Sequence, residues 1–586
     1  MKGYDRYPAK KIADTGGSVF KGQASILKRL KEELTGKGWT LVLETCPGVS
    51  EGEVLKLIRG LGPDLVIPAS DMLLDPEKRQ PLLDGILTDD RVFGRMYRGE
   101  LSDFADPERK KVLEEKIRSA QGKTVVWGFG ASLLCADLLW EKSREEDGKR
   151  KALLICLDIT RWEIQLRFRD GMPNALRDNP REDILKKYKQ GYFLEWRLAD
   201  RIKTECFGRM DYYLDCSRDG DFVMIKAGLF DRLLDEEVSG PFRLVPYFDP
   251  GVWGGQWMKR TFGLDPSAPN YAWSFDGVPE ENSLLFDLEG TMLEMPAMNL
   301  TLMRPVKLLG ERVFDIYGAE FPIRFDFLDT MEGQNLSLQV HPTADYISSA
   351  FGMAYTQDES YYILDAGEDA CVYLGLKEDA DKEEMFRALR RAQAGEEVFD
   401  AEKYVNKIPA SKHDHFLIPA GTIHCSGKNA MVLEISATPF IFTFKLWDWG
   451  RLGLDGKPRP INIERGEKVL LERRTDWVME NLVSRTEVLR QEEGFTEEHT
   501  GLHALEPIET RRLSVEEGGS ARVSCHGSVN MLNLVEGGAC LIESTDGSFP
   551  PFEVHYAETF IVPACAGEYL VRAEGGPVRV MQAFVR

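Results

Sequence analysis

The sequence predicts a multidomain protein in which an α/β domain precedes all-β domains. Its 586 residues exceed the ~250–300 residues that one hydrophobic core supports. Residues 1–240 alternate helical and buried-strand patterns, which is typical of a three-layer fold with a mostly parallel sheet between helices. From residue 241 onward, short strands separated by Gly/Pro turns favour all-β jelly rolls. We therefore expect domains at 1–240, 241–480 and 481–586.

The expected elements of the first domain alternate in type along the chain. Apolar residues at helical spacing, bounded by Gly, Pro or polar residues, predict the helices, and short apolar runs predict the strands. Helices are expected at 26–34, 52–61, 107–120 and 132–141. Strands are expected at 40–44, 65–68, 124–127 and 152–158.

The later domains are predicted to be strands with two helical interruptions. Helical periodicity returns at 382–394 and in a charged stretch at 464–480. The last strands are expected at 529–535 and 558–564. The second of these runs ends in Pro-Ala and is followed by Cys565, where a similar turn earlier in the chain is followed by histidine. We expect the last domain to hold no metal ligands.

Composition excludes several classes of partner. The net charge of −22 disfavours nucleic acid and anionic membranes, which need a basic surface. No apolar signal segment follows Met1, and no run of about 18 apolar residues occurs, so a cytoplasmic protein is expected. The ten cysteines are scattered and form no C-x-x-C pair, which favours reduced thiols. The sequence leaves the oligomeric state open.

Four polar residues in strand contexts predict a metal site. All eight histidines lie after residue 340. Gln339 and His341 alternate on one predicted strand and so share a face. His424 follows an apolar strand and a Pro/Gly turn, and Glu359 opens a strand between these segments. Two imidazoles, a carboxylate and an amide oxygen suit one Zn²⁺ or another divalent ion per chain, with a position left for water or substrate.

With these motifs, the chain resembles the type I mannose-6-phosphate isomerases, zinc enzymes of the cupin superfamily. The resemblance covers roughly residues 241–470. The matching segments are Trp253-Gly-Gly255, Phe321-Pro322, Leu328-Asp329, Leu336 to Pro342, Asp358 to Asp365, Tyr373-Leu-Gly375, Ile418 to His424, Val432 to Ile435 and Trp447 to Arg459. It implies a double jelly-roll cupin that interconverts mannose 6-phosphate and fructose 6-phosphate, and the ligand set Gln339, His341, Glu359 and His424.

The resemblance also implies roles for residues around the metal. Glu434 matches the position of a proposed catalytic base, and a carboxylate near a metal is a reasonable proton shuttle. The alternative is a buried carboxylate paired to Lys445 or Arg451. Lys445 stands near the place of a catalytic arginine and keeps the charge but loses the bidentate fork. Arg451 is expected to share its catalytic work.

The expected phosphate site departs from the family pattern. The family commonly carries lysines where this chain has Asp326 and Asn335. Arg324, two residues before Asp326 on the same strand face, and Arg459 are the expected substrate-binding cations. The altered charge leaves open an isomerase of a different sugar, either unphosphorylated or differently phosphorylated.

The first domain resembles, more loosely, nucleoside-kinase-like phosphotransferases of the P-loop class. The resemblance rests on the layout and on Leu157 to Arg169, where such kinases place arginines over phosphates. The phosphate loop is missing: Gly122-Lys-Thr124 precedes its strand, and Gly128-Phe-Gly130 lacks a third glycine. We expect a non-catalytic module, with a divergent phosphate binder or an active phosphotransferase as alternatives. Basic residues between 161 and 189 form either an anion surface or a solvated face paired to acidic neighbours.

A third hypothesis for the whole chain belongs to another class. In it, the cupin and the kinase-like module form a sugar-responsive regulatory protein without turnover.

Overall fold

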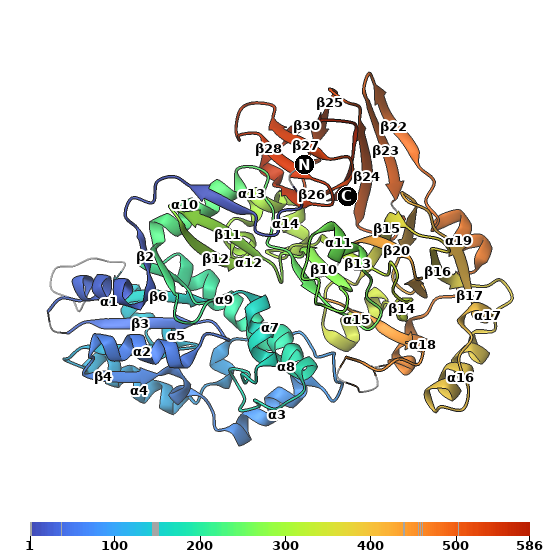
Figure 1. The fold of residues 1–586 in the computed structure, drawn as a ribbon. Coiled ribbons are helices and arrows are strands. Elements are labelled where there is room, and N and C mark those ends of the chain that lie inside the picture. The colour runs from blue at the N-terminus through green and yellow to red at the C-terminus, as the bar shows by residue number, and fades with distance from the viewer. Residues whose placement is uncertain are drawn as a thin grey trace. The chain divides into compact units, whose positions relative to one another are not determined.

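The chain folds into two compact units built from discontinuous segments. The computed structural model describes residues 3–36, 38–142, 152–437, 440–454, 456, 459, 461–501 and 503–586. The N-terminal unit comprises Ala9–Asp235 and Ser283–Met303. The C-terminal unit comprises Met1–Pro8, Glu236–Asn282 and Arg304–Arg586. Figure 1 shows the elements of both units.

The N-terminal unit is built on a seven-stranded sheet in the order β2-β8-β7-β6-β3-β5-β4. The five strands from β7 to β4 run parallel, and β8 and β2 pair antiparallel at one edge. The bounds are β2 Val19–Lys21, β3 Thr40–Thr45, β4 Leu65–Pro68, β5 Thr124–Gly128, β6 Ala152–Asp158, β7 Tyr212–Asp215 and β8 Val223–Lys226. Every residue of β3 and β6 is buried, as expected of parallel strands covered on both faces.

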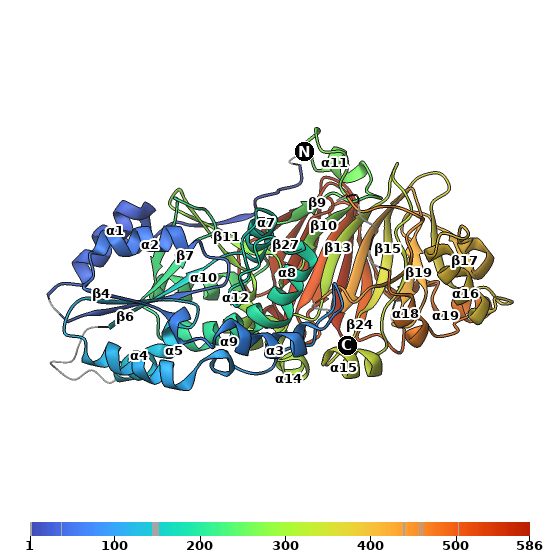
Figure 2. The ribbon, with the colours of Figure 1, turned by 90° about the horizontal axis from the view of Figure 1, so that it is seen from below.

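Helices cover both faces of this sheet. Figure 2 shows α1 and α2 on one side and α4 and α5 on the other. The bounds are α1 Gly22–Glu33, α2 Glu51–Leu61, α3 Pro76–Leu87, α4 Pro107–Ser119, α5 Ala131–Leu134, α6 Ala136–Lys142, α7 Arg161–Arg169, α8 Ile184–Gln190, α9 Trp196–Phe207 and α10 Ala227–Val238. The helix expected at 132–141 is divided into α5 and α6, because Cys135 leaves helical geometry at ψ 13°.

A second, three-stranded sheet in the N-terminal unit includes a distant part of the chain. Strand β1 (Ala9–Ile12) pairs in parallel with β11 (Ser283–Leu288), which forms a hairpin with β12 (Thr291–Pro296). Helix α12 (Met298–Met303) follows it. Asn299 donates to Asp158 Oδ2 at 2.9 Å, at the end of β6. This segment lies in the range that the sequence analysis gave to the second domain, and its strand pairing with β1 and its hydrogen bond to Asp158 attach it to the N-terminal unit.

The C-terminal unit contains four antiparallel sheets, two of them from the first part of its sequence. The six-stranded sheet has the order β18-β15-β20-β13-β10-β9, and the five-stranded sheet has the order β17-β16-β19-β14-β21. Their bounds are β9 Tyr247–Asp249, β10 Trp273–Gly277, β13 Arg324–Asp329, β14 Leu338–Val340, β15 Asp358–Ala366, β16 Cys371–Leu376, β17 Val405–Pro409, β18 His415–Ile418, β19 His424–Ser426, β20 Ala430–Ala437 and β21 Phe444–Trp447.

Short helices connect these strands. Their bounds are α11 Trp257–Thr261, α13 Pro305–Leu309, α14 Glu311–Tyr317, α15 Ala344–Phe351, α16 Lys382–Gln393, α17 Ala401–Tyr404, α18 Ile463–Val469 and α19 Thr475–Asn481. Helix α16 matches the helix expected at 382–394. The stretch expected at 464–480 instead forms two helices, because Leu470 at the end of α18 is extended.

The last two sheets enclose a common hydrophobic core. Their orders are β22-β23-β24-β31-β26-β29 and β25-β30-β27-β28. The bounds are β22 Glu487–Glu492, β23 Phe495–Gly501, β24 Ile508–Val515, β25 Ser520–Ser524, β26 Asn530–Glu536, β27 Ala539–Ser544, β28 Phe552–His555, β29 Thr559–Val562, β30 Glu568–Glu574 and β31 Val578–Val585. Leu513, Leu532, Ile542 and Val571, from both sheets, are fully buried in this core. Across the described residues, no helix has the length and apolar character needed to span a membrane.

A buried ion pair ties the start of the C-terminal unit to its last sheets. Arg243 Nη1 lies 2.6 Å from Glu558 Oε1, and the side chains are 3% and 1% exposed. Breaking such a pair leaves an uncompensated buried charge, at a cost of about 3–5 kcal/mol. We expect Arg243→Met to lower the urea midpoint of the unit's unfolding transition, followed by tryptophan fluorescence.

The matched control is an exposed pair in the same unit. Arg522 and Glu568 are 63% and 52% exposed, so Arg522→Met should cost less than about 1 kcal/mol. Equal shifts for both variants would show that the buried pair has no special weight.

Candidate metal centre

The four predicted ligands meet between the six-stranded and five-stranded sheets. Gln339 lies on β14. His341 is the first residue after β14 and lies on the same face as Gln339. His424 opens β19 and pairs with Gln339 across the ladder. Glu359 comes from β15 of the other sheet. All four side chains are buried, with exposed fractions between 0% and 6%.

The Glu359 carboxylate lies between the two imidazoles. Its Oε2 is 3.0 Å from His341 Nε2, and its Oε1 is 2.8 Å from His424 Nε2. Ligand atoms of these three residues all lie within 4.8 Å of one another. Gln339 Nε2 lies 3.3 Å from His424 Nε2. The predicted set is therefore one cluster of side chains.

The other ring nitrogen of each histidine fixes the tautomer. His341 Nδ1 lies 2.8 Å from the Phe442 carbonyl oxygen, and His424 Nδ1 lies 2.9 Å from that of Thr422. A carbonyl oxygen only accepts, so each Nδ1 carries the proton and each Nε2 lone pair faces the cluster. Among the described residues, neither His341 Nε2 nor Glu359 Oε1 receives a hydrogen bond. Acceptors that face one another in this way fit a divalent cation.

Two residues that the sequence analysis did not identify orient the ligands. Gln357 Nε2 donates to Glu359 Oε2 at 2.8 Å, and Ser337 Oγ donates to Gln339 Oε1 at 3.2 Å. Gln357 and Ser337 each lie two residues before the ligand that they contact. The alternation of side chains that placed Gln339 and His341 on one face could therefore have identified these two residues as well. Rotating the Gln339 amide by 180° points its oxygen at the cluster and lets its nitrogen donate to Ser337.

The electrostatics favour an ionised carboxylate between the imidazoles. Burial raises the pKa of Glu359, but the two neighbouring histidines outweigh burial and hold it well below its usual range. Burial lowers the pKa of His424. Burial also lowers the pKa of His341, but Glu359 more than offsets this, so a proton competes with a metal ion there.

The predicted base Glu434 stands beside the cluster on β20. In the ladder it lies opposite Asp326 on one side and Tyr361 on the other. Burial, followed by the charges of Glu359 and Asp326, raises the pKa of Glu434 well above its usual range.

The predicted cations divide into two groups. Lys445 on β21 lies opposite Gln339 and so shares its face of the sheet. Arg451 and Arg459 meet instead on Asp448. Arg451 Nη2 donates to Asp448 Oδ1 at 2.5 Å, and Arg459 Nη1 forms an ion pair with Asp448 Oδ2 at 2.7 Å. Arg451 also donates to the Asn335 carbonyl oxygen at 2.7 Å.

Of the Trp447 to Arg459 motif, residues Asp455, Lys457 and Pro458 lie outside the described part of the chain.

Arg324 and Asp326, at the expected phosphate position, bond to each other. Arg324 Nε donates to Asp326 Oδ1 at 3.2 Å, and both side chains are at most 5% exposed. Burial raises the pKa of Asp326 to about 6, in spite of Arg324. The prediction that the two share a strand face is confirmed by this contact. The guanidinium charge is largely offset within the protein.

Comparison with known proteins shows similarity to mannose-6-phosphate isomerases over about 40% of the chain. The probable mannose-6-phosphate isomerase GmuF of Bacillus subtilis is 27% identical over 235 residues, which are 40% of this chain and 69% of that protein. The mannose-6-phosphate isomerase of Streptococcus mutans is 29% identical over 235 residues, or 40% of this chain and 68% of that protein.

A solved structure and a family model also match the chain. The crystal structure of the mannose 6-phosphate isomerase from Bacillus subtilis aligns with a TM-score of 0.49 and 18% identity, and covers 59% of this chain and 99% of that one. Residues 22–239 match a family model described as a domain of unknown function, DUF8485. The N-terminal part thus resembles a family without a stated activity, and the chain as a whole is similar in part to sugar-phosphate isomerases.

Proposed function

We propose that the C-terminal unit is a metal-dependent aldose–ketose isomerase that interconverts mannose 6-phosphate and fructose 6-phosphate. The observation that carries the proposal is the convergence of two Nδ1-anchored imidazoles on Glu359, with Glu434 beside them. The names of the relatives supply the substrate class. A metal site placed next to a carboxylic acid suits proton transfer at the carbon next to a carbonyl group.

The chain's own residues divide the work as follows. A divalent ion, with Zn²⁺ as the first candidate, would be held by Gln339, His341, Glu359 and His424, and when bound would polarise the sugar carbonyl. Glu434, in its carboxylate form, takes the proton from C2 of the opened sugar and, as the resulting carboxylic acid, returns it to C1. Its position opposite Asp326 and Tyr361 in the ladder puts it beside the ligand cluster.

Cations on the β21 side are proposed to meet the phosphate. Lys445 is the leading residue, because it shares the face of Gln339. Arg451 is proposed as a second catalytic cation and Arg459 as a substrate-binding one. Both are already bound to Asp448, which positions them and reduces their net charge. Arg324 is proposed to bind substrate after exchanging its contact with Asp326.

A second candidate is an isomerase of an unphosphorylated sugar. The closed pair between Arg324 and Asp326 favours it, since a dianion gains little from a guanidinium that a buried carboxylate already offsets. A neutral hydroxyl group, by contrast, hydrogen-bonds to either partner of such a pair.

We further propose that the N-terminal unit is a kinase-like module without phosphoryl transfer. Gly122 and Lys123 precede β5, away from any helix start. The backbone N–H groups of Gly130 and Ser132, where α5 begins, donate to the Glu44 carboxylate at 2.7 Å each. An internal carboxylate thus occupies the place of a phosphate. Domains at 1–240, 241–480 and 481–586, the last two as cupins, remain our proposed division.

Metal content tests the ligand set. About one divalent ion per chain should co-purify, and His341→Ala or His424→Ala should lose most of it, because each removes one of few ligands. The readout is elemental analysis of purified protein. His415→Ala is the matched control, since this buried histidine bonds Ser360 instead of the cluster. Full occupancy in His424→Ala would refute the assignment.

Proton transfer tests Glu434. Glu434→Gln keeps the shape of the side chain, and we expect kcat to fall about 10²–10⁴-fold while metal content stays unchanged. Isomerase turnover on mannose 6-phosphate is the measurement. Glu497→Gln, a buried carboxylate bound to Arg511 in the last sheets, is the control and should keep full activity. Unchanged turnover in Glu434→Gln removes Glu434 from the reaction.

Substrate charge tests the choice between the two sugars. Asp326→Asn removes the carboxylate that offsets Arg324, so KM for mannose 6-phosphate should fall about tenfold, the value of one charge-assisted hydrogen bond. KM for free mannose should change little. Better turnover of free hexoses than of their 6-phosphates by the unmodified protein would instead establish the second candidate.

A further inference from the structure

The turn between β18 and β19, residues 419–422, crosses from one sheet of the C-terminal unit to the other. Strand β18 belongs to the six-stranded sheet and β19 to the five-stranded sheet. Glu359 lies in the first of these sheets, and Gln339 and His424 lie in the second. The turn therefore joins the two sheets beside the ligand cluster, and its conformation affects how His424 stands relative to Glu359.

Two backbone N–H groups of the turn hold segments that carry the other predicted ligands. Ala420 N donates to Asp358 Oδ1 at 2.8 Å, and Asp358 directly precedes Glu359 on β15. Gly421 N donates to the carbonyl oxygen of His341 at 3.0 Å. A displacement of the turn would therefore act on the segments of Glu359 and His341 together.

Thr422 connects the turn to the His424 ring. Its carbonyl oxygen accepts from His424 Nδ1 at 2.9 Å, and this bond directs the Nε2 lone pair of His424 to the cluster. The Thr422 hydroxyl donates to the Pro419 carbonyl oxygen at 2.6 Å, and the Thr422 N–H reaches the same oxygen at 3.2 Å. The Pro419 carbonyl group and the Thr422 side chain therefore fix the peptide that orients the imidazole.

Arg473 binds both of these groups from the segment between α18 and α19. Its Nη1 donates to the Pro419 carbonyl oxygen at 2.7 Å and to the Thr422 hydroxyl oxygen. The residue is only 8% exposed, and its guanidinium carbon lies 5.3 Å from the centre of the Trp477 ring. Its carbonyl oxygen accepts from Leu376 N at 2.8 Å, at the end of β16. The arginine is therefore held at its backbone, along its side chain and at its donor group.

The segment that carries Arg473 also packs directly against the turn. Leu471 N donates to the Gly421 carbonyl oxygen at 2.9 Å. Gly421 has a φ of 86°, and a Cβ at this position would lie 2.8 Å from the Leu471 side chain and 3.1 Å from the Val469 carbonyl oxygen. This close approach limits how far the turn can relax on that side, so the position of Arg473 is transmitted to the turn.

We propose that Arg473 is a positioning residue of the metal centre, which holds the His424 imidazole at its binding angle through the Pro419 carbonyl group and the Thr422 hydroxyl group. The inference rests on the metal site of the proposed function and adds to it a residue that no ligand touches. The described contacts of Arg473 include no metal ligand, so it acts through the turn. Removing a group that orients a ligand typically weakens metal binding about 10–100-fold.

Metal affinity tests this role in the full-length protein after its metal has been removed. We expect Arg473→Met to weaken Zn²⁺ binding about 10–100-fold in competition with a chromogenic chelator. It should also shift the absorption bands of Co²⁺ bound in place of zinc, because the angle of one imidazole changes. Affinities and spectra equal to those of the unmodified protein overturn the proposal.

The neighbouring arginine is the matched control. Arg474 also donates to backbone carbonyl oxygens, those of Lys377, Glu378 and Ala380, and its described contacts include none in the turn. Arg474→Met should therefore bind Zn²⁺ and Co²⁺ as the unmodified protein does. An equal loss of affinity in Arg474→Met and Arg473→Met would assign the effect to general loosening of this segment and overturn the proposal.

Thr422→Val tests the link without removing a charge. It deletes the hydroxyl group that Arg473 binds and should weaken Zn²⁺ binding about threefold or more, the value of one neutral hydrogen bond. The control is Thr475→Val, whose hydroxyl group donates to Asn406 Oδ1 at 2.8 Å instead. The loss in the double variant of Arg473 and Thr422 should be smaller than the product of the two single losses, because the two residues share one contact. If Arg473→Met does not fold, Thr422→Val decides, and unchanged affinity there refutes the proposal.

Amide hydrogen exchange of the metal-free protein gives a readout without any ligand. Peptides that cover residues 419–424 should exchange faster in Arg473→Met than in Arg474→Met, and equal exchange contradicts the proposal. None of these measurements depends on turnover. Loss of metal affinity in Arg473→Met supports the inference even in a protein that isomerises no sugar, and in that case only the proposed reaction fails. An unmodified protein that binds neither ion overturns the ligand set and this inference together.

Discussion

The arrangement of the C-terminal unit depends on one contact, the Glu359 carboxylate held between two imidazoles. The contact requires both sheets in register, because Glu359 comes from one and the histidines come from the other. The backbone carbonyls of Phe442 and Thr422 fix the tautomers, so the loops that carry them are part of the site. Burying a cluster of acceptors is costly unless a cation binds to them. A metal-binding role therefore accounts for so many polar groups at one place in an apolar interior.

Local patterns predicted many of the strands and which polar side chains gather between the two sheets. Strand alternation placed Gln339 and His341 on one face, and β3 and β6 lie within a residue of their expected bounds. Pairing between distant segments was not readable from the sequence. The hydrogen bond from Asn299 to Asp158, which draws residues 283–303 to the N-terminal unit, joins positions 141 residues apart. Periodicity carries no information about such contacts.

The same limit applies to the charges. The sequence showed which arginines exist near the motifs, but each partner was fixed only by the fold. Arg451 and Arg459 share Asp448, and Arg324 bonds Asp326. A chain with a net charge of −22 has a surplus of carboxylates to neutralise its cations. Counting basic residues therefore overstates the positive potential that a phosphate would meet.

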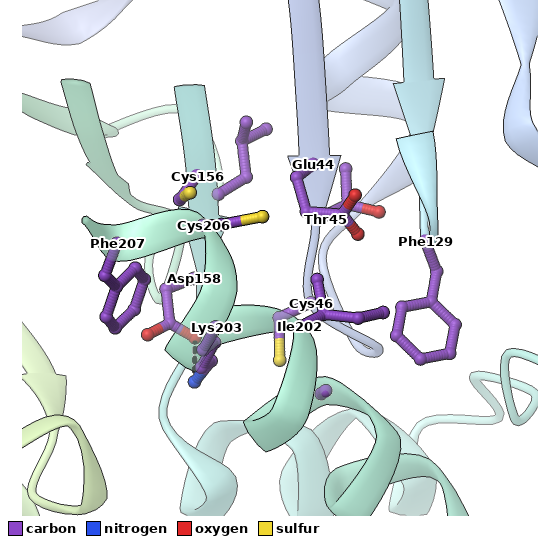
Figure 3. A pocket seen from close by; sticks show the side chains of 12 residues that line it. Glu44, Thr45, Cys46, Phe129, Cys156, Asp158, Ile202, Lys203, Cys206 and Phe207 are labelled. Atoms are coloured by element: carbon purple, nitrogen blue, oxygen red, sulfur yellow. Dashed lines mark ion pairs between the residues drawn. The ribbon is translucent and has the colours of Figure 1, made fainter. Parts of the chain in front are cut away.

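Internal contacts also occupy the polar groups at the carboxyl ends of the parallel strands in the N-terminal unit. The Glu44 carboxylate accepts from the backbone N–H groups of Gly130 and Ser132, and Asp158 pairs with Lys203 (Figure 3) and accepts from Asn299. These side chains therefore find their partners within the protein. The connections after β3 and β6 diverge because of the strand order, so the switch point between them exists independently of the sequence of the loops around it.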